Sequence, residues 1–139
     1  MHRDIKPKNI LMFGPKDDMI PKIGDFGVAK RIDKTAVTHT RVGHDLYMAP
    51  EVRVLGRYSF PADIFSLSMT LFEMFNEQEV LQSSDEVKQF IMNVISGRAG
   101  EIPGSCKVPE RLEILIVRGL NETPNKRPAL FEFRSALQG

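Results

Sequence analysis

The stretch from Ala62 to Phe75 constrains the fold of this chain most strongly, because it is apolar nearly all round. Pro61 precedes it and suits the first position of a helix, where a missing backbone N–H leaves no hydrogen bond unmade. A helix without a polar face has to be surrounded by protein. We therefore predict a buried helix here, with core side chains that include Leu67, Leu71, Met74 and Phe75.

A β-hairpin is predicted near the start of the chain. Apolar runs at 9–13 and 19–23 flank the sequence Gly14–Asp18, whose glycine, proline and aspartates are typical turn residues. By contrast, residues 28–48 are polar, show no helical period and are predicted to form a long loop.

Three more helices are predicted in the second half. Ser83–Glu86 is a capping box in front of an apolar stripe that ends at Gly97. Pro109 and Pro128 can each open a helix. Apolar residues at helical spacing give the expected core positions, which are Leu112, Leu115, Ile116 and Leu120 for the third helix and Leu130, Phe133 and Leu137 for the fourth. The fold class that follows is α+β, mainly α.

Composition gives information about the binding partners and the cellular location of the chain. The 139 residues carry 19 basic and 18 acidic side chains, a net charge of +1, which gives no electrostatic reason for a nucleic-acid partner. The sequence contains no apolar run long enough to span a membrane. Cys106 is the only cysteine, so no internal disulfide can form, and an intracellular, cytoplasmic location is the expectation.

Three short motifs follow one another in a fixed order. The run His2–Asn9 reads HRDIKPKN, Asp25–Gly27 reads DFG after the predicted hairpin, and Tyr47–Glu51 reads YMAPE. Each alone is modest, and polar turn residues capping a hairpin would be the plain alternative for the first two. Together they closely resemble eukaryotic-type protein kinases, whose catalytic loop has the pattern H-R-D-x-x-x-x-N. The resemblance covers almost the whole chain.

The resemblance implies a catalytic role for four residues. Asp4 would accept or orient the proton of the attacking hydroxyl, and Lys6 would face the transferring phosphate of ATP. Asn9 and Asp25 would supply oxygen ligands for Mg²⁺. A lysine two positions after the catalytic aspartate resembles serine/threonine kinases, so the implied partners are ATP and protein substrates carrying serine or threonine.

Other residues receive regulatory or structural roles from the same resemblance. Arg3 would pair with a phosphate on the loop, for which Thr35, Thr38 and Thr40 are candidates, although an unmodified, solvated threonine is an equal alternative for each. The residues with implied structural roles are His2, Phe26, Gly27, Glu51, Asp63 and Arg127. Of these, Asp63 would anchor the catalytic loop, and Arg127 would pair with Glu51.

The implied organisation is a partial kinase domain over 1–139, with the catalytic loop at 2–9, the activation segment at 25–51 and a helical remainder at 60–139. It corresponds to the C-terminal lobe, beginning at the catalytic loop, with the small sheet-rich N-terminal lobe absent. These residues include no glycine-rich phosphate loop and no strand lysine of the V-A-I-K type. We therefore expect the chain alone to be inactive.

Some positions depart from the family pattern. His44 stands where serine/threonine kinases generally carry threonine, which puts full activity in doubt, and Phe65 and Ser68 replace the usual tryptophan and glycine of the buried helix. A non-catalytic interaction module or decoy, or a truncated gene product, stays open as an alternative. The substrate, the kinase subfamily and the oligomeric state are also left open.

Overall fold

The protein was analysed as a computed structural model, which describes residues 1–24, 46–75 and 109–138 together with the single positions 89, 92, 93, 96 and 98. In chain order, the elements are η1 (Pro7–Asn9), β1 (Ile10–Phe13), β2 (Ile20–Ile23), α2 (Pro50–Leu55), α3 (Phe60–Phe75), α5 (Glu110–Gly119), η3 (Pro124–Lys126) and α6 (Leu130–Gln138). The described part is thus mainly helical with a two-stranded sheet, as predicted.

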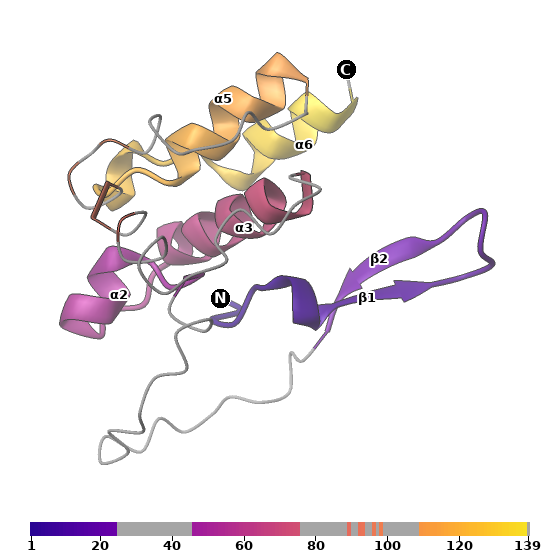
Figure 1. Ribbon diagram of the computed structural model, residues 1–139, viewed down its shortest axis with the longest axis horizontal. Helices are drawn as coiled ribbons and strands as arrows, with labels where there is room; N and C mark the ends of the chain where they lie inside the picture. Colours follow the sequence, from indigo (N-terminus) through magenta and orange to yellow (C-terminus); the bar gives the residue numbers. More distant parts are fainter. Residues whose placement is uncertain are drawn as a thin grey trace, which may run out of the picture.

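The β-hairpin is confirmed. Strands β1 and β2 pair antiparallel, with Ile10 opposite Ile23 and Phe13 opposite Ile20. The backbone N–H of Asp18 closes the turn by donating to the carbonyl of Pro15 (2.9 Å). The hairpin extends away from the helices (Figure 1), and most of its large apolar side chains are exposed.

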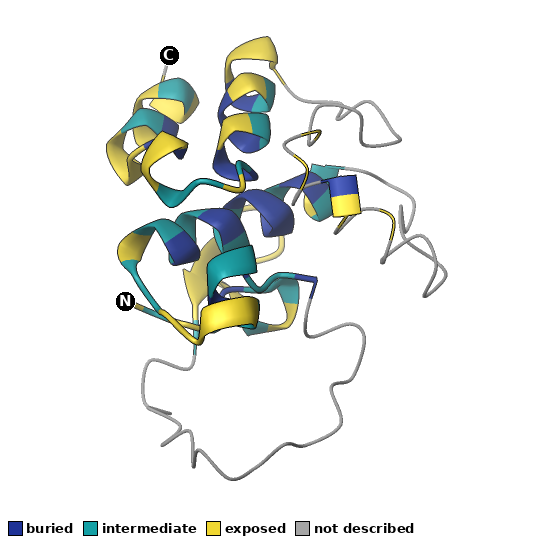
Figure 2. Cartoon of the chain, turned by 90° about the vertical axis from the view of Figure 1, so that its left-hand side faces the viewer, coloured by how far each residue is buried: buried dark blue, intermediate teal, exposed yellow. Residues whose placement is uncertain are grey.

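Helix α3 lies at the centre of the helical part. Helices α5 and α6 lie on one side of it and the N-terminal loop on the other (Figures 1 and 2). Its buried face follows helical spacing, with Ala62, Phe65, Met69 and Phe72 inside. The prediction of a helix buried all round is wrong at its end, because Met74 is 54% exposed. Helical spacing places Met74 opposite Phe65, away from the buried residues of α3.

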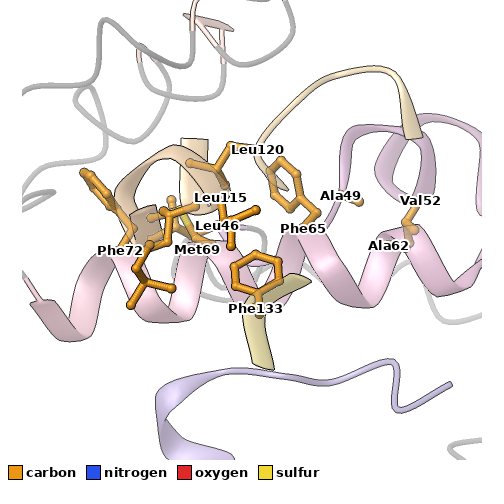
Figure 3. Close-up of a cluster of buried hydrophobic side chains, with 12 residues drawn as sticks. Leu46, Ala49, Val52, Ala62, Phe65, Met69, Phe72, Leu115, Leu120 and Phe133 are labelled. Carbon is orange, nitrogen blue, oxygen red and sulfur yellow. The ribbon is translucent and has the colours of Figure 1, made fainter. Parts of the chain in front are cut away.

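The core is one apolar cluster. Phe65, Met69 and Phe72 of α3 meet Leu115 of α5 and Phe133 of α6 in a cluster that includes Leu46, and Ala49 and Val52 extend this cluster toward Ala62 (Figure 3). The predicted core positions Leu112, Leu115 and Ile116 of α5 are all buried, and so is Leu120, which directly follows the helix. In α6 only Phe133 is buried, and the prediction is wrong for Leu130 and Leu137, which are 62% and 66% exposed. A helix at the edge of a domain has few neighbouring elements, so it buries fewer of its apolar residues than the helical spacing in its sequence predicts.

Helix α2 was not predicted. Pro50 stands in its first turn, and Gly56 ends it in the left-handed conformation (φ 63°) while donating its N–H to the carbonyl of Val52 (2.8 Å). Helix α2 has only six residues, which are too few to show a helical period in the sequence. The helix predicted after Ser83–Glu86 lies mostly outside the described residues.

A close approach joins α3 and α5. A Cβ atom built on Gly119 would lie 1.8 Å from the Oγ of Ser68 and 2.8 Å from its Cβ, so the fold requires glycine at this contact. Ser68 is fully buried, and its hydroxyl has no hydrogen-bond partner among the described residues. Packing of the two helices therefore decides what each position tolerates.

Candidate active site

The N-terminal loop is tied to α3 through the carboxylate of Asp63. The backbone N–H groups of His2 and Arg3 donate to its two oxygens, at 2.7 Å and 2.8 Å. Arg3 has a φ of 69°, in the left-handed region that side chains other than glycine seldom occupy. Strained backbone of this kind persists only where its surroundings hold it. Asp63, some sixty positions away in the sequence, provides that hold.

The ring of His2 links the loop to the end of the hairpin. Its Nε2 lies 2.9 Å from the carbonyl oxygen of Gly24, and the backbone N–H of Asp4 points to its Nδ1 at 3.3 Å. A neutral ring protonated on Nε2 satisfies both contacts, since Nε2 then donates and Nδ1 accepts. Gly24 also donates its N–H to the carbonyl of Asn9 (2.6 Å). The loop and the residue before Asp25 are therefore held together.

Asp4, Lys6 and Asn9 converge. The Nζ of Lys6 lies 3.0 Å from Oδ1 of Asp4, and the Nδ2 of Asn9 donates to Oδ2 at 2.9 Å and to the carbonyl of Asp4 at 2.7 Å. The short helix η1 brings Asn9 back toward Asp4, because Pro7 opens it and Asn9 ends it. A carboxylate with two donors on separate oxygens is held in one orientation.

A pocket opens beside this carboxylate. Its walls come from the loop, from the segment before and within α2, from Tyr58 and from the first turns of α3; the lining residues are Arg3, Asp4, Ile5, Lys6, Tyr47, Met48, Ala49, Val52, Tyr58, Ala62, Asp63 and Ser66. The lining combines the charged loop residues Arg3, Asp4 and Lys6 with apolar residues such as Met48 and Val52. A side chain entering the pocket would thus reach Asp4 and Lys6.

Tyr47 is fastened to α3 at two points. The hydroxyl of Ser66 donates to the carbonyl of Tyr47 (2.6 Å), and the hydroxyl of Tyr47 donates to the carboxylate of Glu73. Burial and the bond with Glu73 raise the pKa of the Tyr47 hydroxyl well above its usual value. Sequence reasoning missed Ser66 and Glu73, because nothing in an apolar helix marks which polar residues face a neighbouring segment.

Glu51 and Arg127 form a buried ion pair. Two guanidinium nitrogens of Arg127 donate to the two carboxylate oxygens of Glu51 (2.7 Å and 2.8 Å), and the arginine side chain has no exposed surface. The remaining N–H groups donate to the carbonyls of Pro61, Asn121 and Glu122. All five donors of the guanidinium thus have acceptors.

Several predicted site residues lie outside the described residues. They are Asp25, Phe26 and Gly27 of the second motif and the threonines Thr35, Thr38 and Thr40; His44 lies outside as well. The structure brings together His2, Arg3, Asp4, Lys6, Asn9 and Asp63 at one place, and Glu51 with Arg127 at another. No group of three or more metal-ligating side chains is found within the described ranges.

The comparisons with known proteins agree with the motifs. The family model described as "Protein kinase domain" matches residues 1–138, nearly the whole chain. The chain belongs to the protein kinase domain family. A kinase-family chain normally uses ATP with magnesium, and the atoms present suit it: Asn9 commits its amide nitrogen to Asp4, which leaves its oxygen for a cation.

Relatives with this kinase domain are serine/threonine kinases. The chain is 33% identical to serine/threonine-protein kinase ATG1c of Arabidopsis thaliana over 77% of its length, and 33% identical to Nek8 of Danio rerio over 95%. It is 34% identical to the ovarian-specific kinase Lok of Drosophila melanogaster over 93%. The matches span 14%, 18% and 28% of those proteins. Within the described residues, no helix is long and apolar enough to cross a membrane.

Proposed function

We propose that this chain is the C-terminal lobe of a serine/threonine protein kinase, and that the protein carrying it transfers a phosphoryl group from ATP to serine or threonine hydroxyls of proteins. The observation that carries the proposal is the Asp4 carboxylate, held between the Nζ of Lys6 (3.0 Å) and the Nδ2 of Asn9 (2.9 Å) on a loop anchored by Asp63. We further propose the catalytic loop at 2–9, the activation segment at 25–51 and an intracellular, cytoplasmic location.

Asp4 is the group that takes up or orients the proton of the substrate hydroxyl. Its carboxylate, which Lys6 and Asn9 contact, lines the pocket that a substrate hydroxyl would enter. Those two bonds also fix which way the carboxylate faces. Phosphoryl transfer asks the protein for positioning and charge neutralisation more than for covalent chemistry, and this arrangement supplies the positioning.

Lys6 and Asn9 act on the phosphates of ATP. The ammonium of Lys6 stays next to Asp4 and can approach the oxygens of the transferring group. Asn9, whose amide nitrogen is bound to Asp4, would offer its amide oxygen to a cation. Asn9 and Asp25 would hold magnesium, which would supply positive charge that neutralises the phosphates. Arg3 would pair with a phosphorylated threonine at position 35, 38 or 40, and Phe26 and Gly27 would shape the segment after Asp25.

The exposed hairpin supports the assignment to one lobe. Leu11, Phe13 and Ile20 present large apolar surfaces on β1 and β2, and a two-stranded hairpin is marginally stable by itself. Contiguous exposed apolar surface marks a place where protein packs. A second lobe covering the hairpin would bury this surface and complete the ATP site, so we expect the isolated chain to bind ATP weakly and to be inactive.

The test is phosphoryl transfer by the full-length protein. With radiolabelled ATP, magnesium and a serine/threonine peptide library, we expect incorporation that Asp4→Asn or Lys6→Met reduces by roughly a hundredfold or more. Asp17→Asn, a matched change at the exposed hairpin turn, is the control and should leave the rate unchanged. A full-length protein that folds, binds ATP and still transfers nothing would sink the proposal and favour the interaction-module alternative.

A further inference from the structure

Tyr58 lines the pocket together with the charged residues Arg3, Asp4, Lys6 and Asp63. It belongs to the connection between α2 and α3, and its half-buried ring packs against the apolar core. The guanidinium carbon of Arg3 lies 5.4 Å from the centre of the ring, within the range of a cation–π contact. The ring thus packs against the apolar core and contacts the Arg3 guanidinium.

The backbone of Arg3 limits where its side chain can go. Its left-handed conformation and the bond from its N–H to Asp63 fix the starting point of the side chain beside the pocket. The adjacent residue is Asp4, and an arginine and a carboxylate in reach of each other form strong, often two-bond pairs. Such a pair would compete with Lys6 and Asn9 for the oxygens that they contact.

The surroundings of the Tyr58 hydroxyl place it among the same groups. Burial raises its pKa, the nearby charge of Arg3 lowers it, and the charges of Asp4 and Asp63 raise it. The tyrosine therefore stands close to the arginine and to both carboxylates. No motif marks it, because its role depends on residues more than fifty positions earlier in the chain.

We propose that Tyr58 is a positioning residue of the catalytic loop: its ring holds the Arg3 guanidinium away from the Asp4 carboxylate, so that Asp4 keeps its contacts with Lys6 and Asn9 and its capacity to accept a hydroxyl. The inference rests on the proposed function. Its structural part, the place of the Arg3 guanidinium, can be measured without activity.

The first test follows Arg3 itself by NMR of the full-length protein with labelled arginine. The ring current of Tyr58 should shift the Arg3 Nε–H proton upfield in the wild type. We expect this shift to persist in Tyr58→Phe and to be replaced by a downfield shift in Tyr58→Leu, as the guanidinium moves to a carboxylate. An Arg3 signal that is the same in wild type and Tyr58→Leu would overturn the inference, whether or not the protein is active.

The second test is kinetic. Tyr58→Leu should lower kcat by about tenfold with a KM for ATP within about twofold of the wild type, while Tyr58→Phe retains wild-type kcat. In an Arg3→Gln background, Tyr58→Leu should change kcat by less than about twofold, since the residue acts through Arg3. Losses that multiply in the double variant, or a loss in Tyr58→Phe as large as in Tyr58→Leu, would contradict the proposal.

Folding is checked by the thermal unfolding midpoint of each variant. If Tyr58→Leu does not fold, Tyr58→Met takes its place, because methionine fills the half-buried site without an aromatic face. Wild-type protein that transfers no phosphate would refute the proposed function, and the NMR result would still decide the position of Arg3. An active wild type whose Tyr58→Leu and Tyr58→Met variants keep full kcat would refute only the role of Tyr58.

Discussion

Arg127 donates two hydrogen bonds to the carboxylate of Glu51 from a position 76 residues further along the chain. The pair joins the start of α2 to the segment between η3 and α6, and the same guanidinium also donates to the carbonyl of Pro61 in the first turn of α3. A single side chain thus connects the motif beside the pocket to the C-terminal helices.

Removing this arginine should strongly destabilise the fold. Arg127→Ala leaves the Glu51 carboxylate without its partner in a partly buried place, a change that costs about 3–5 kcal/mol in comparable buried pairs. Arg127→Lys should recover only part of the loss, because an ammonium cannot reproduce five planar donors. The measurement is the free energy of unfolding in urea.

The matched control is Arg118, whose guanidinium lies 3.1 Å from the carboxylate of Glu132 at a far more exposed place. Exposed pairs contribute about 0–1 kcal/mol, so Arg118→Ala should change the free energy of unfolding little. Equal losses at Arg127 and Arg118 would show that burial of the pair does not matter.

The contact between Ser68 and Gly119 gives a test of helix packing. Gly119→Ala should destabilise by about 1–3 kcal/mol, because the new Cβ overlaps the side chain of Ser68. Ser68→Gly in the same protein should restore most of the loss. Ser68→Ala alone should be neutral or stabilising, since it removes a buried hydroxyl that lacks a partner in the described residues.

Thermal and urea unfolding of the three single variants and the double variant measure this contact. Additive effects of Gly119→Ala and Ser68→Gly would contradict it, because residues that do not touch show no coupling energy.

Asp63 should matter to both folding and catalysis. Asp63→Asn replaces one of the two oxygens that accept from His2 and Arg3, so the loop loses a hydrogen bond and the support of its left-handed residue. We expect a loss of about 1–3 kcal/mol in the free energy of unfolding and a fall in kcat of the full-length protein of roughly a hundredfold. The control Glu122→Gln, at an exposed position, should change neither the free energy of unfolding nor kcat. A folded Asp63→Asn protein with wild-type kcat would argue against loop anchoring.

The bond from Tyr47 to Glu73 predicts a dependence of stability on alkaline pH. The pKa of the Tyr47 hydroxyl is raised in the folded state above its ordinary value of 10.0. The contribution of Tyr47 to stability is therefore fully present below pH 10. It is lost as the pH rises above 10, because the tyrosine of the unfolded chain ionises first. The decline in the free energy of unfolding above pH 10 should therefore be shallower in Tyr47→Phe than in the wild type.

At neutral pH, Tyr47→Phe should cost about 1.5–3 kcal/mol, because the hydrogen bond goes to a charged acceptor. Urea unfolding from pH 7 to pH 11 measures both effects. An unchanged alkaline slope in Tyr47→Phe would mean that Tyr47 already ionises in the folded state.

Much of the fold could be predicted because local sequence reports local structure. The turn residues at 14–18 predicted the hairpin, and helical spacing predicted the buried residues of α5. The same reasoning overestimated burial at Met74, Leu130 and Leu137, which are exposed. Periodicity shows which side chains could be buried, whereas the number of neighbouring elements decides how wide a stripe is covered.

The candidate site divides in the same way. The order of the motifs indicated the family, and the resemblance to that family implied the roles of Asp4, Lys6 and Asn9. The resemblance implied that Asp63 anchors the loop, but only the tertiary structure showed its carboxylate accepting from the backbone of Arg3, and it alone placed Tyr58 against the Arg3 guanidinium and Glu73 beside Tyr47. These contacts join residues from 26 to 60 positions apart. These long-range contacts depend on how α3 packs against its neighbours, which cannot be predicted from the spacing of residues in the sequence.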